Sequence, residues 1–258
     1  MSELSAIFFD IDDTLYSTTE FAVQARRNSV NAMIRAGLRM DPEECLRELN
    51  EVIGEFSSNY EQHFDKLLLR IPQKCYDGIN PGILIASAVV AYHDTKVQQL
   101  VPFPNVPEVL ERLSQTNLIL GVITDGRDIK QAEKLVRLRV LEYLTPTAIF
   151  ISDQIGISKP NAKLYQKACQ DMGLDPHKVI YIGDNPRNDI DPANRIGMTT
   201  VWFKGGGKHS REQGETRATY EIQDFMELLD ILNTKYGVKT SDWIKTTAKR
   251  LAGTILPK

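Results

Sequence analysis

Short apolar runs recur along this chain and alternate with longer segments of helical periodicity. The apolar runs lie at residues 6–9, 118–123, 148–151, 179–182 and 199–203. Segments typical of helices lie near residues 106–115, 128–138, 161–173 and 188–196. Because strands that alternate with helices form βαβ units, this pattern predicts a parallel sheet with right-handed crossovers.

The interval at residues 16–103 lacks this alternation and has a predominantly helical pattern. Asp41 precedes a proline and two glutamates, an order typical of an N-cap and the first helical turn. Asn80, which also precedes a proline, offers a second helix start. The apolar segment 82–92 is far shorter than the roughly 20 residues that span a bilayer, so we expect a buried helix there.

The predicted architecture is α/β. A Rossmann-like parallel-sheet core would comprise residues 1–15 and 104–236, with an α-helical cap domain at residues 16–103 inserted into it. Residues 237–258 would form a C-terminal extension, in which Trp243 begins a basic, amphipathic helical pattern. We expect this extension to pack on the protein itself rather than on a partner or a membrane surface.

Composition narrows the function classes. The chain has 258 residues, of which 42% are hydrophobic and 25% charged, as in ordinary globular proteins of one or two domains. A net charge of −3 gives no reason to expect nucleic acid or an anionic membrane as partner. Three widely spaced cysteines without a C-x-x-C pair predict reduced thiols in a cytoplasmic protein. No secretory signal or membrane span is expected, and a homo-oligomer is left open.

Two carboxylates, those of Asp10 and Asp12, follow the first apolar run. Residues two apart in an extended segment share a face, so we expect these groups to lie close together. They would repel each other unless one is protonated or a cation lies between them. One could attack as a nucleophile while the other exchanges a proton. The alternative is a solvated turn after an edge strand, so the pair needs support from the rest of the chain.

A second group of polar residues follows the apolar run 118–123. It consists of Thr124, Asp125 and Gly126. A threonine hydroxyl and backbone N–H groups at such a glycine turn can bind phosphate oxygens. Because strands often end in threonine, this turn alone is a weak indication of function.

Two later segments contribute a cation and further carboxylates. Lys159 precedes a predicted helix whose N-cap would be Asn161. Asp184 ends the run at 179–182, and Asp189 lies five residues later. Ligands of open α/β sheets bind at the carboxyl ends of the strands, where these side chains are expected to meet.

In order and approximate spacing, these four segments resemble the signatures of the haloacid dehalogenase-like (HAD) hydrolase superfamily. The resemblance spans about residues 6–203 and is closest to the subfamily I phosphatases, whose cap domain lies between the first and second signatures. It implies a Mg²⁺-dependent phosphatase that hydrolyses a small phosphorylated metabolite through an aspartyl-phosphate intermediate. Sugar phosphates, phosphoglycolate and pyrimidine nucleoside monophosphates are all compatible with the sequence.

The resemblance also implies a role for each residue. Asp10 would attack phosphorus, and Asp12 would act as acid and then as base, which requires a pKa nearer neutrality. Mg²⁺ would be held by the side chains of Asp10 and Asp184 and the backbone carbonyl of Asp12. Asp189 would hold a metal-bound water or orient Lys159. The phosphoryl group would be bound by Thr124, Asp125, Gly126 and Lys159.

Asp125 departs from the commoner pattern, because many members of the superfamily have asparagine after the second-signature hydroxyl. A carboxylate that faces a phosphate is repelled, so we expect the side chain to turn away and its N–H to face the ligand. The alternative is an inward carboxylate that selects a substrate with a positive group.

Other activities of the same superfamily stay open at this point. Dehalogenases attack carbon and typically lack the second carboxylate, so Asp12 favours phosphoryl transfer over dehalogenation. A phosphomutase needs the same acid and base. A non-catalytic interaction protein on this scaffold is a further alternative, disfavoured because every expected residue is present. Gly205–Gly207 fails the Walker pattern and is predicted to be a flexible loop after the last core strand.

Overall fold

Six strands form one parallel sheet, in the order β3-β2-β1-β4-β5-β6. The computed structural model describes residues 4–57 and 60–240. The strands are β1 (Ala6–Phe9), β2 (Ile119–Thr124), β3 (Ile149–Ile151), β4 (Val179–Gly183), β5 (Thr199–Phe203) and β6 (Tyr220–Ile222). The α/β fold predicted from the sequence is confirmed, and β6 is an additional strand that the apolar pattern did not predict.

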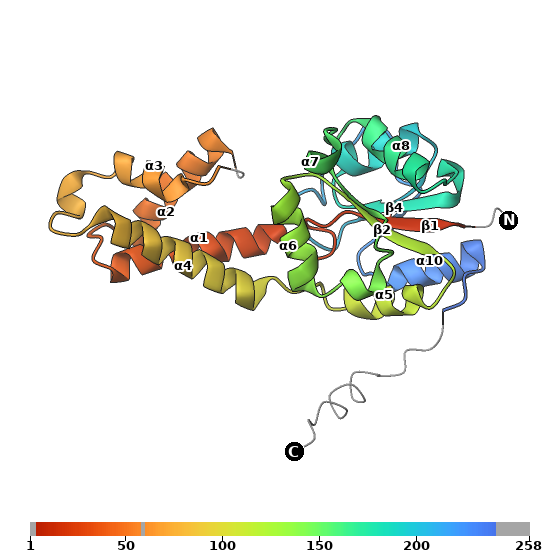
Figure 1. The fold of residues 1–258 in the computed structure, drawn as a ribbon, viewed down its shortest axis with the longest axis horizontal. Coiled ribbons are helices and arrows are strands. Elements are labelled where there is room, and N and C mark those ends of the chain that lie inside the picture. Colours follow the sequence, from red (N-terminus) through yellow and green to blue (C-terminus); the bar gives the residue numbers. More distant parts are fainter. Residues whose placement is uncertain (1–3, 58–59, 241–258) are drawn as a thin grey trace, which may run out of the picture.

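β1 lies at the centre of the sheet, because it pairs with β2 on one side and with β4 on the other. All four of its residues are buried, as expected for a parallel strand covered on both faces. Helices cover both faces in Figure 1, with α7 and α8 on one side and α5 and α10 on the other. The core helices are α5 (Val106–Ser114), α6 (Asp128–Leu138), α7 (Ser152–Ile155), α8 (Ala162–Asp171), α9 (Asp191–Arg195) and α10 (Met226–Tyr236).

Four helices between β1 and α5 lie to one side of the sheet and form what we call the helical unit (Figure 1). They are α1 (Thr18–Arg35), α2 (Pro42–Phe56), α3 (His63–Arg70) and α4 (Pro81–Gln99). This unit has its own apolar cluster, centred on Met33, Leu49, Leu67 and Leu84. The sheet has two others, one on each face. The helical unit therefore has a hydrophobic core of its own.

The predicted helix starts are confirmed by capping bonds. The Asp41 carboxylate accepts a hydrogen bond from the Glu44 N–H at 3.0 Å, and the Asn80 side chain accepts one from Gly82 at 2.8 Å. In the core, the Asn161 side chain caps α8 in the same way, at 3.0 Å from the Lys163 nitrogen. Each cap satisfies a backbone donor that lacks an intrahelical partner.

Segment 82–92 is only half buried, so the prediction of a buried helix there is partly wrong. Leu84 and Ala88 of α4 are fully buried, whereas Ile83 and Val90 are each 57% exposed. One face of the helix packs on α1 and the other contacts solvent. Within the described part of the chain, no helix is both long and apolar enough to cross a membrane.

The helix predicted at 188–196 is present, as a π-helix at Pro186–Ile190 that continues into the short helix α9. The prediction for the glycine segment needs correction. The glycine segment 205–207 does form a loop after β5, but β5 is not the last strand. The loop also packs closely, since a Cβ on Gly207 would lie 2.6 Å from Cβ of Asp13. The amphipathic helix predicted from Trp243 onward lies outside the described residues.

Candidate active site

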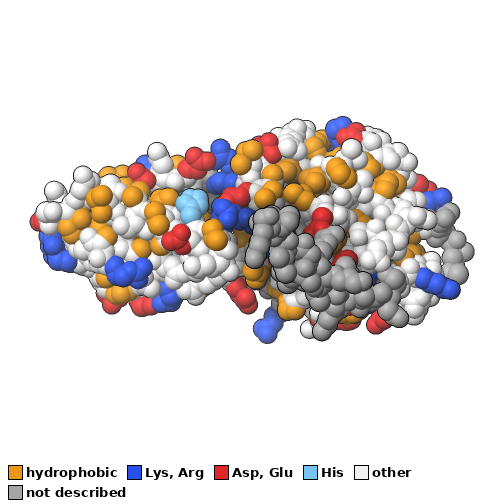
Figure 2. All heavy atoms as spheres, turned by 60° about the horizontal axis from the view of Figure 1, so that its bottom comes forward, with side chains coloured by type: hydrophobic (Ala, Val, Ile, Leu, Met, Phe, Trp, Pro, Cys, Tyr) orange, Lys and Arg blue, Asp and Glu red, His pale blue; other side chains and the backbone are white. Residues whose placement is uncertain are grey.

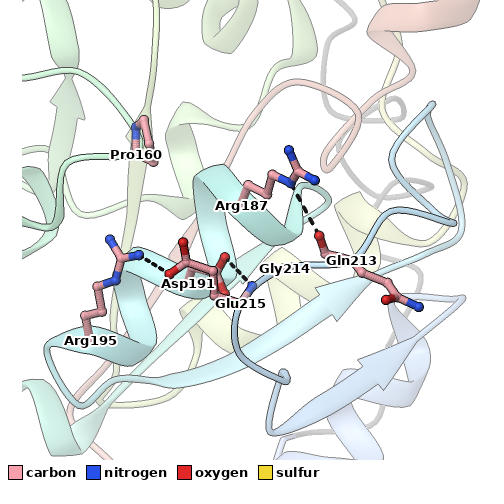
Figure 3. Close-up of a pocket in the computed structure, with 7 residues that line it drawn as sticks. All are labelled: Pro160, Arg187, Asp191, Arg195, Gln213, Gly214 and Glu215. Carbon is pink, nitrogen blue, oxygen red and sulfur yellow. Dashed lines mark hydrogen bonds and ion pairs between the residues drawn. The ribbon is translucent and has the colours of Figure 1, made fainter.

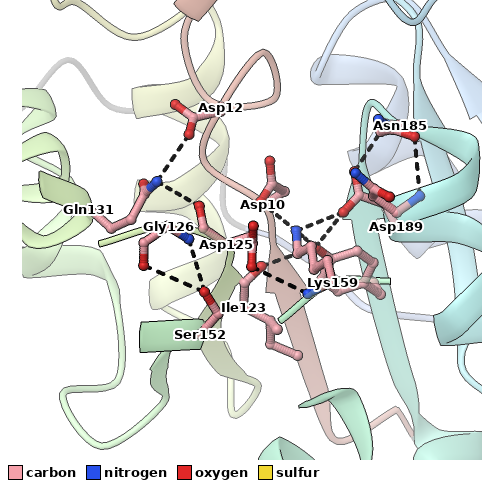
Figure 4. A network of polar contacts seen from close by, with 12 residues as sticks. Asp10, Asp12, Ile123, Asp125, Gly126, Gln131, Ser152, Lys159, Asn185 and Asp189 are labelled. Carbon is pink, nitrogen blue, oxygen red and sulfur yellow. Dashed lines mark hydrogen bonds and ion pairs between the residues drawn. The ribbon is translucent and has the colours of Figure 1, made fainter. Parts of the chain in front are cut away.

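The carboxyl ends of the central strands bring together three carboxylates and one lysine. Figure 4 shows Asp10, Asp189 and Lys159 of this cluster. Asp10 follows β1, Asp184 follows β4, and Asp189 lies in the π-helix Pro186–Ile190 after β4. Lys159 reaches this cluster from the loop before α8, and its Nζ lies 2.6 Å from Asp10 Oδ1 and 2.7 Å from Asp189 Oδ1. Three segments that are far apart in the sequence thus converge at one edge of the sheet, as expected for an open α/β fold.

All three N–H donors of Lys159 have acceptors in the protein. The third donates to the Tyr181 hydroxyl at 2.8 Å, and that hydroxyl also lies 3.0 Å from the carbonyl oxygen of Ile123. Because an ammonium group has only three donors, Lys159 must exchange one of these bonds to bind a phosphoryl oxygen. Asp189 therefore does contact Lys159, one of its two expected roles.

A carboxylate oxygen from each of Asp10, Asp184 and Asp189 lies within 4.8 Å of the others. Burial, together with the charges of Asp189 and Asp10, raises the pKa of Asp184 to about 9. Burial also raises the pKa of Asp10 to about 7, although the nearby charge of Lys159 opposes this rise. Buried carboxylates crowd together at such a cost only where a cation or a proton compensates them.

The donor set fits a magnesium ion. Asp184 Oδ2 is buried and, within the described residues, has no hydrogen-bond partner. Mg²⁺ prefers oxygen ligands and is typically bound through one or two carboxylates. Gly183 permits the close approach of Asp189, because a Cβ at position 183 would lie 2.4 Å from Asp189 Cγ. The cluster could therefore hold Mg²⁺ through Asp10, Asp184 and Asp189.

Asp12 differs from the expectation in both its partners and its pKa. Its side chain is directed towards α6, whereas Asp10 faces Lys159 (Figure 4). Lys134 of α6 donates to Oδ1 and Oδ2 of Asp12 at 2.7 and 2.6 Å. Burial alone would raise the pKa of Asp12, but the charge and hydrogen bonds of Lys134 outweigh it and lower the pKa below its usual value. The sequence-based expectation of a pKa nearer neutrality is thus wrong for this arrangement.

The second-signature turn agrees in part with the prediction. The Asp125 side chain turns away from the carboxylate cluster as expected, since it accepts bonds from the Ser158 hydroxyl at 2.5 Å and the Lys159 N–H at 3.2 Å. It therefore fixes the loop that carries Lys159. The N–H of Gly126 donates to Ser152 Oγ at 2.9 Å, so Gly126, like Lys159, must exchange a bond to bind a phosphate oxygen. Thr124 Oγ1 is buried and has no partner among the described residues, which suits a phosphate-binding hydroxyl.

Sequence reasoning missed three residues that contact the site. Gln131 and Lys134 lie three residues apart on α6, and both donate to Asp12. Their spacing on the helix after the second signature was the available signal. Tyr181 is the one hydroxyl-bearing residue in the apolar run of β4, and this also could have drawn attention to it.

A separate cavity of about 380 Å³ lies beside Asp191 of α9 (Figure 3). Its charged side chains contact the protein itself, and Arg187 donates to the carbonyl oxygen of Gln213 at 3.4 Å. Asp191 accepts hydrogen bonds from the backbone of residues 215 and 216, and Arg195 pairs with Glu215. The cavity lies between α9 and the loop after β5, which these hydrogen bonds connect. The carboxylate cluster does not line it.

Comparison with known proteins shows the family to which this chain belongs. The sequence model of the haloacid dehalogenase-like hydrolases matches residues 7–203. A glyceraldehyde 3-phosphate phosphatase of Methanopyrus kandleri is 42% identical over 234 residues, which cover 89% of this chain and 97% of the relative. A glyceraldehyde 3-phosphate phosphatase of Pyrococcus furiosus is 38% identical over 239 residues, which cover 92% and 96% of the two chains.

Solved structures agree in fold. A HAD hydrolase of Bacillus subtilis, YfnB, solved with magnesium bound, superposes with a TM-score of 0.63 at 19% identity. The superposition covers 90% of this chain and all of the other. The superposition leaves out only a tenth of this chain, which is less than the helical unit contains. The similarity therefore includes the helical unit as well as the sheet.

Proposed function

This chain belongs to the haloacid dehalogenase-like hydrolase family and is a phosphatase of phosphomonoesters, and we propose that its substrate is glyceraldehyde 3-phosphate. Two phosphatases of that substrate share 42% and 38% identity with it over nearly their whole lengths. Their similarity includes the helical unit, which adjoins the site and can shape the pocket for the leaving group. The products would be glyceraldehyde and inorganic phosphate.

The observation that supports the chemistry is the buried cluster around Asp10. Asp10 would attack phosphorus in line, and Thr124 and Lys159 would bind the phosphoryl oxygens. The unpartnered hydroxyl of Thr124 and the contact of Lys159 with Asp10 support these roles. Asp12 would give a proton to the leaving oxygen and then take one from water.

Mg²⁺ is the proposed cofactor, held by the side chains of Asp10, Asp184 and Asp189 and the backbone carbonyl of Asp12. When bound, it would supply positive charge against the phosphoryl oxygens and the crowded carboxylates. Within the protein, Lys159 holds Asp10 and Asp189 in place, and the Tyr181 hydroxyl also donates to Asp189. Asp125 fixes the loop that carries Lys159.

We further propose that residues 1–15 and 104–236 form the catalytic core and residues 16–103 a cap that selects the substrate. The separate apolar cluster of the helical unit supports this division. Residues 237–258 would form an extension outside both. A cytoplasmic location fits the three cysteines, all of which are free thiols.

Steady-state hydrolysis of a panel of phosphomonoesters tests the proposal. The panel should contain glyceraldehyde 3-phosphate, glycerol 3-phosphate, phosphoglycolate and a pyrimidine nucleoside monophosphate, each assayed with Mg²⁺ by phosphate release. The proposal predicts that kcat/KM for glyceraldehyde 3-phosphate exceeds the others by about tenfold or more, a margin that pocket contacts can supply. Asp10→Asn, which keeps the shape of the side chain, should be inactive on every substrate.

A clear preference for another member of the panel would reject the proposed substrate and leave the phosphatase chemistry intact. Activity of Asp10→Asn equal to that of the wild type would instead reject the role of Asp10.

A further inference from the structure

Lys134 contacts both carboxylate oxygens of Asp12 from a helix that none of the four signatures includes. Its Nζ lies 2.7 Å from Oδ1 and 2.6 Å from Oδ2. The lysine side chain is 18% exposed and that of Asp12 is 30% exposed, so the pair is largely shielded from water. Hydrogen bonds between charged groups at these distances are strong and directional.

Three other side chains also donate hydrogen bonds to the Asp12 carboxylate. The hydroxyls of Tyr16 and Thr18 donate to Oδ1 at 2.9 and 2.6 Å, and Gln131 donates to Oδ2 at 3.2 Å. With Lys134, Oδ1 has three donors and Oδ2 has two, which fills the lone pairs of the carboxylate. A substrate oxygen or a water can therefore reach Asp12 only by replacing one of these donors.

The helix that carries Lys134 also contacts the helical unit. Glu133, the residue before it, accepts a hydrogen bond from Lys96 of α4 at 2.7 Å. Arg127, which precedes α6, forms an ion pair with Glu61. Charged side chains of both signs lie where the narrow helical unit meets the wider core in Figure 2. Thus α6 links the helical unit to Asp12.

We propose that Lys134 is a positioning residue for Asp12, which directs its carboxyl group towards the side of the site that receives the leaving group. In-line attack by Asp10 places the leaving oxygen on the opposite side of phosphorus. This inference rests on the proposed function, because it takes Asp12 as the acid and base.

Both proton transfers of the reaction depend on the position of the Asp12 carboxyl group. A bond forms between Asp10 and phosphorus while the bond from phosphorus to the bridging oxygen breaks. The proton that Asp12 took from water in the preceding turnover moves to that oxygen. A water molecule then gives a proton to the Asp12 carboxylate and its oxygen to phosphorus, and the bond from Asp10 to phosphorus breaks. Lys134 neither gains nor loses a proton in either step.

Leaving-group dependence tests this role. An alkoxide such as that of glyceraldehyde needs a proton to leave, whereas 4-nitrophenolate leaves readily without one. The value of kcat/KM reports the steps up to leaving-group departure, so hydrolysis of the phosphoenzyme does not affect it. For Lys134→Met we expect kcat/KM to fall about tenfold with glyceraldehyde 3-phosphate and less than about threefold with 4-nitrophenyl phosphate, a partial loss of the 10²–10⁴-fold contribution of an acid.

Two further variants provide controls. Lys134→Arg can still donate to both oxygens and should recover most of the loss with glyceraldehyde 3-phosphate. Lys167→Met removes a lysine that donates to both oxygens of Asp171 on α8, at 2.8 and 2.9 Å, and should leave both substrates unaffected. Thermal unfolding of each variant shows whether it is folded.

Equal falls with the two substrates, no fall with either, or a rise with glyceraldehyde 3-phosphate would overturn the role of Lys134 while the phosphatase assignment stands. If Lys134→Met does not fold, Lys134→Arg and Lys134→Gln decide by the same ratio of kcat/KM values. Wild-type protein that hydrolyses neither substrate would instead overturn the proposed function, and this inference with it.

Discussion

At the scale of single residues, the site has an excess of buried negative charge. Asp10, Asp184 and Asp189 are almost fully buried, and among residues 4–57 and 60–240 Lys159 is the one cation that forms ion pairs with them, contacting Asp10 and Asp189. When all three are ionised, one charge opposes three. An uncompensated buried charge is expensive, so such a cluster must take up protons or a divalent cation. The raised pKa values of Asp10 and Asp184 show that these two groups take up protons readily. Bound Mg²⁺ would compensate the charge instead.

Magnesium binding is therefore expected to release protons. Mg²⁺ binds ionised carboxylates, whereas the pKa values of about 7 for Asp10 and about 9 for Asp184 keep these groups partly protonated at neutral pH. Affinity for Mg²⁺ should consequently rise as the pH increases from 6 to 9, with about one proton or more released per ion at pH 7. Isothermal titration calorimetry in buffers of different ionisation enthalpy measures both quantities.

Asp184→Asn provides the comparison for this prediction, since it removes one of the two titrating groups. It should bind Mg²⁺ more weakly and release fewer protons. Wild-type affinity that stays constant from pH 6 to 9, without proton release, would contradict the charge balance described for the cluster.

At the scale of elements, the hydrophobic pattern was sufficient where a strand or helix is long and buried. β1, β2 and β4 were located to within a residue or two because both faces of each strand are buried. β6 was missed because it has only three residues, of which Glu221 is exposed. The helix predicted at 188–196 is present, and its first part, Pro186–Ile190, is a π-helix from which Asp189 contacts Lys159.

The N-cap of α2 should contribute measurably to the stability of the helical unit. In Asp41→Ala the carboxylate that accepts from Glu44 is lost, and we expect the free energy of unfolding to fall by about 1 kcal/mol. Asp41→Asn keeps an oxygen in the same place and should lose much less. Urea denaturation followed by circular dichroism measures both. An equally large loss in the asparagine variant would show that the hydrogen bond is not the cause.

At the scale of the whole molecule, the site depends on contacts between segments far apart in the sequence. The four signatures and their positions at the strand ends were predicted, because chain order and strand polarity determine them. The contact of Lys134 with Asp12 joins residues 122 apart in sequence, and the contact of Lys96 with Glu133 joins the helical unit to α6. The spacing of Gln131 and Lys134 places them on one face of α6, but which group that face meets follows from how the two parts pack. The contact with Asp12, and with it the direction of the pKa shift, therefore required the structure.

The central claim is that hydrolysis proceeds through a phosphoryl group on Asp10. The most direct measurement is rapid acid quenching of enzyme, Mg²⁺ and substrate labelled in the phosphoryl group, followed by mass spectrometry of the peptide that contains Asp10. The account predicts a transient acyl phosphate on Asp10, sensitive to hydroxylamine and absent from Asp10→Asn. Turnover of the wild type without any phosphorylated Asp10, or label on another residue, would contradict it.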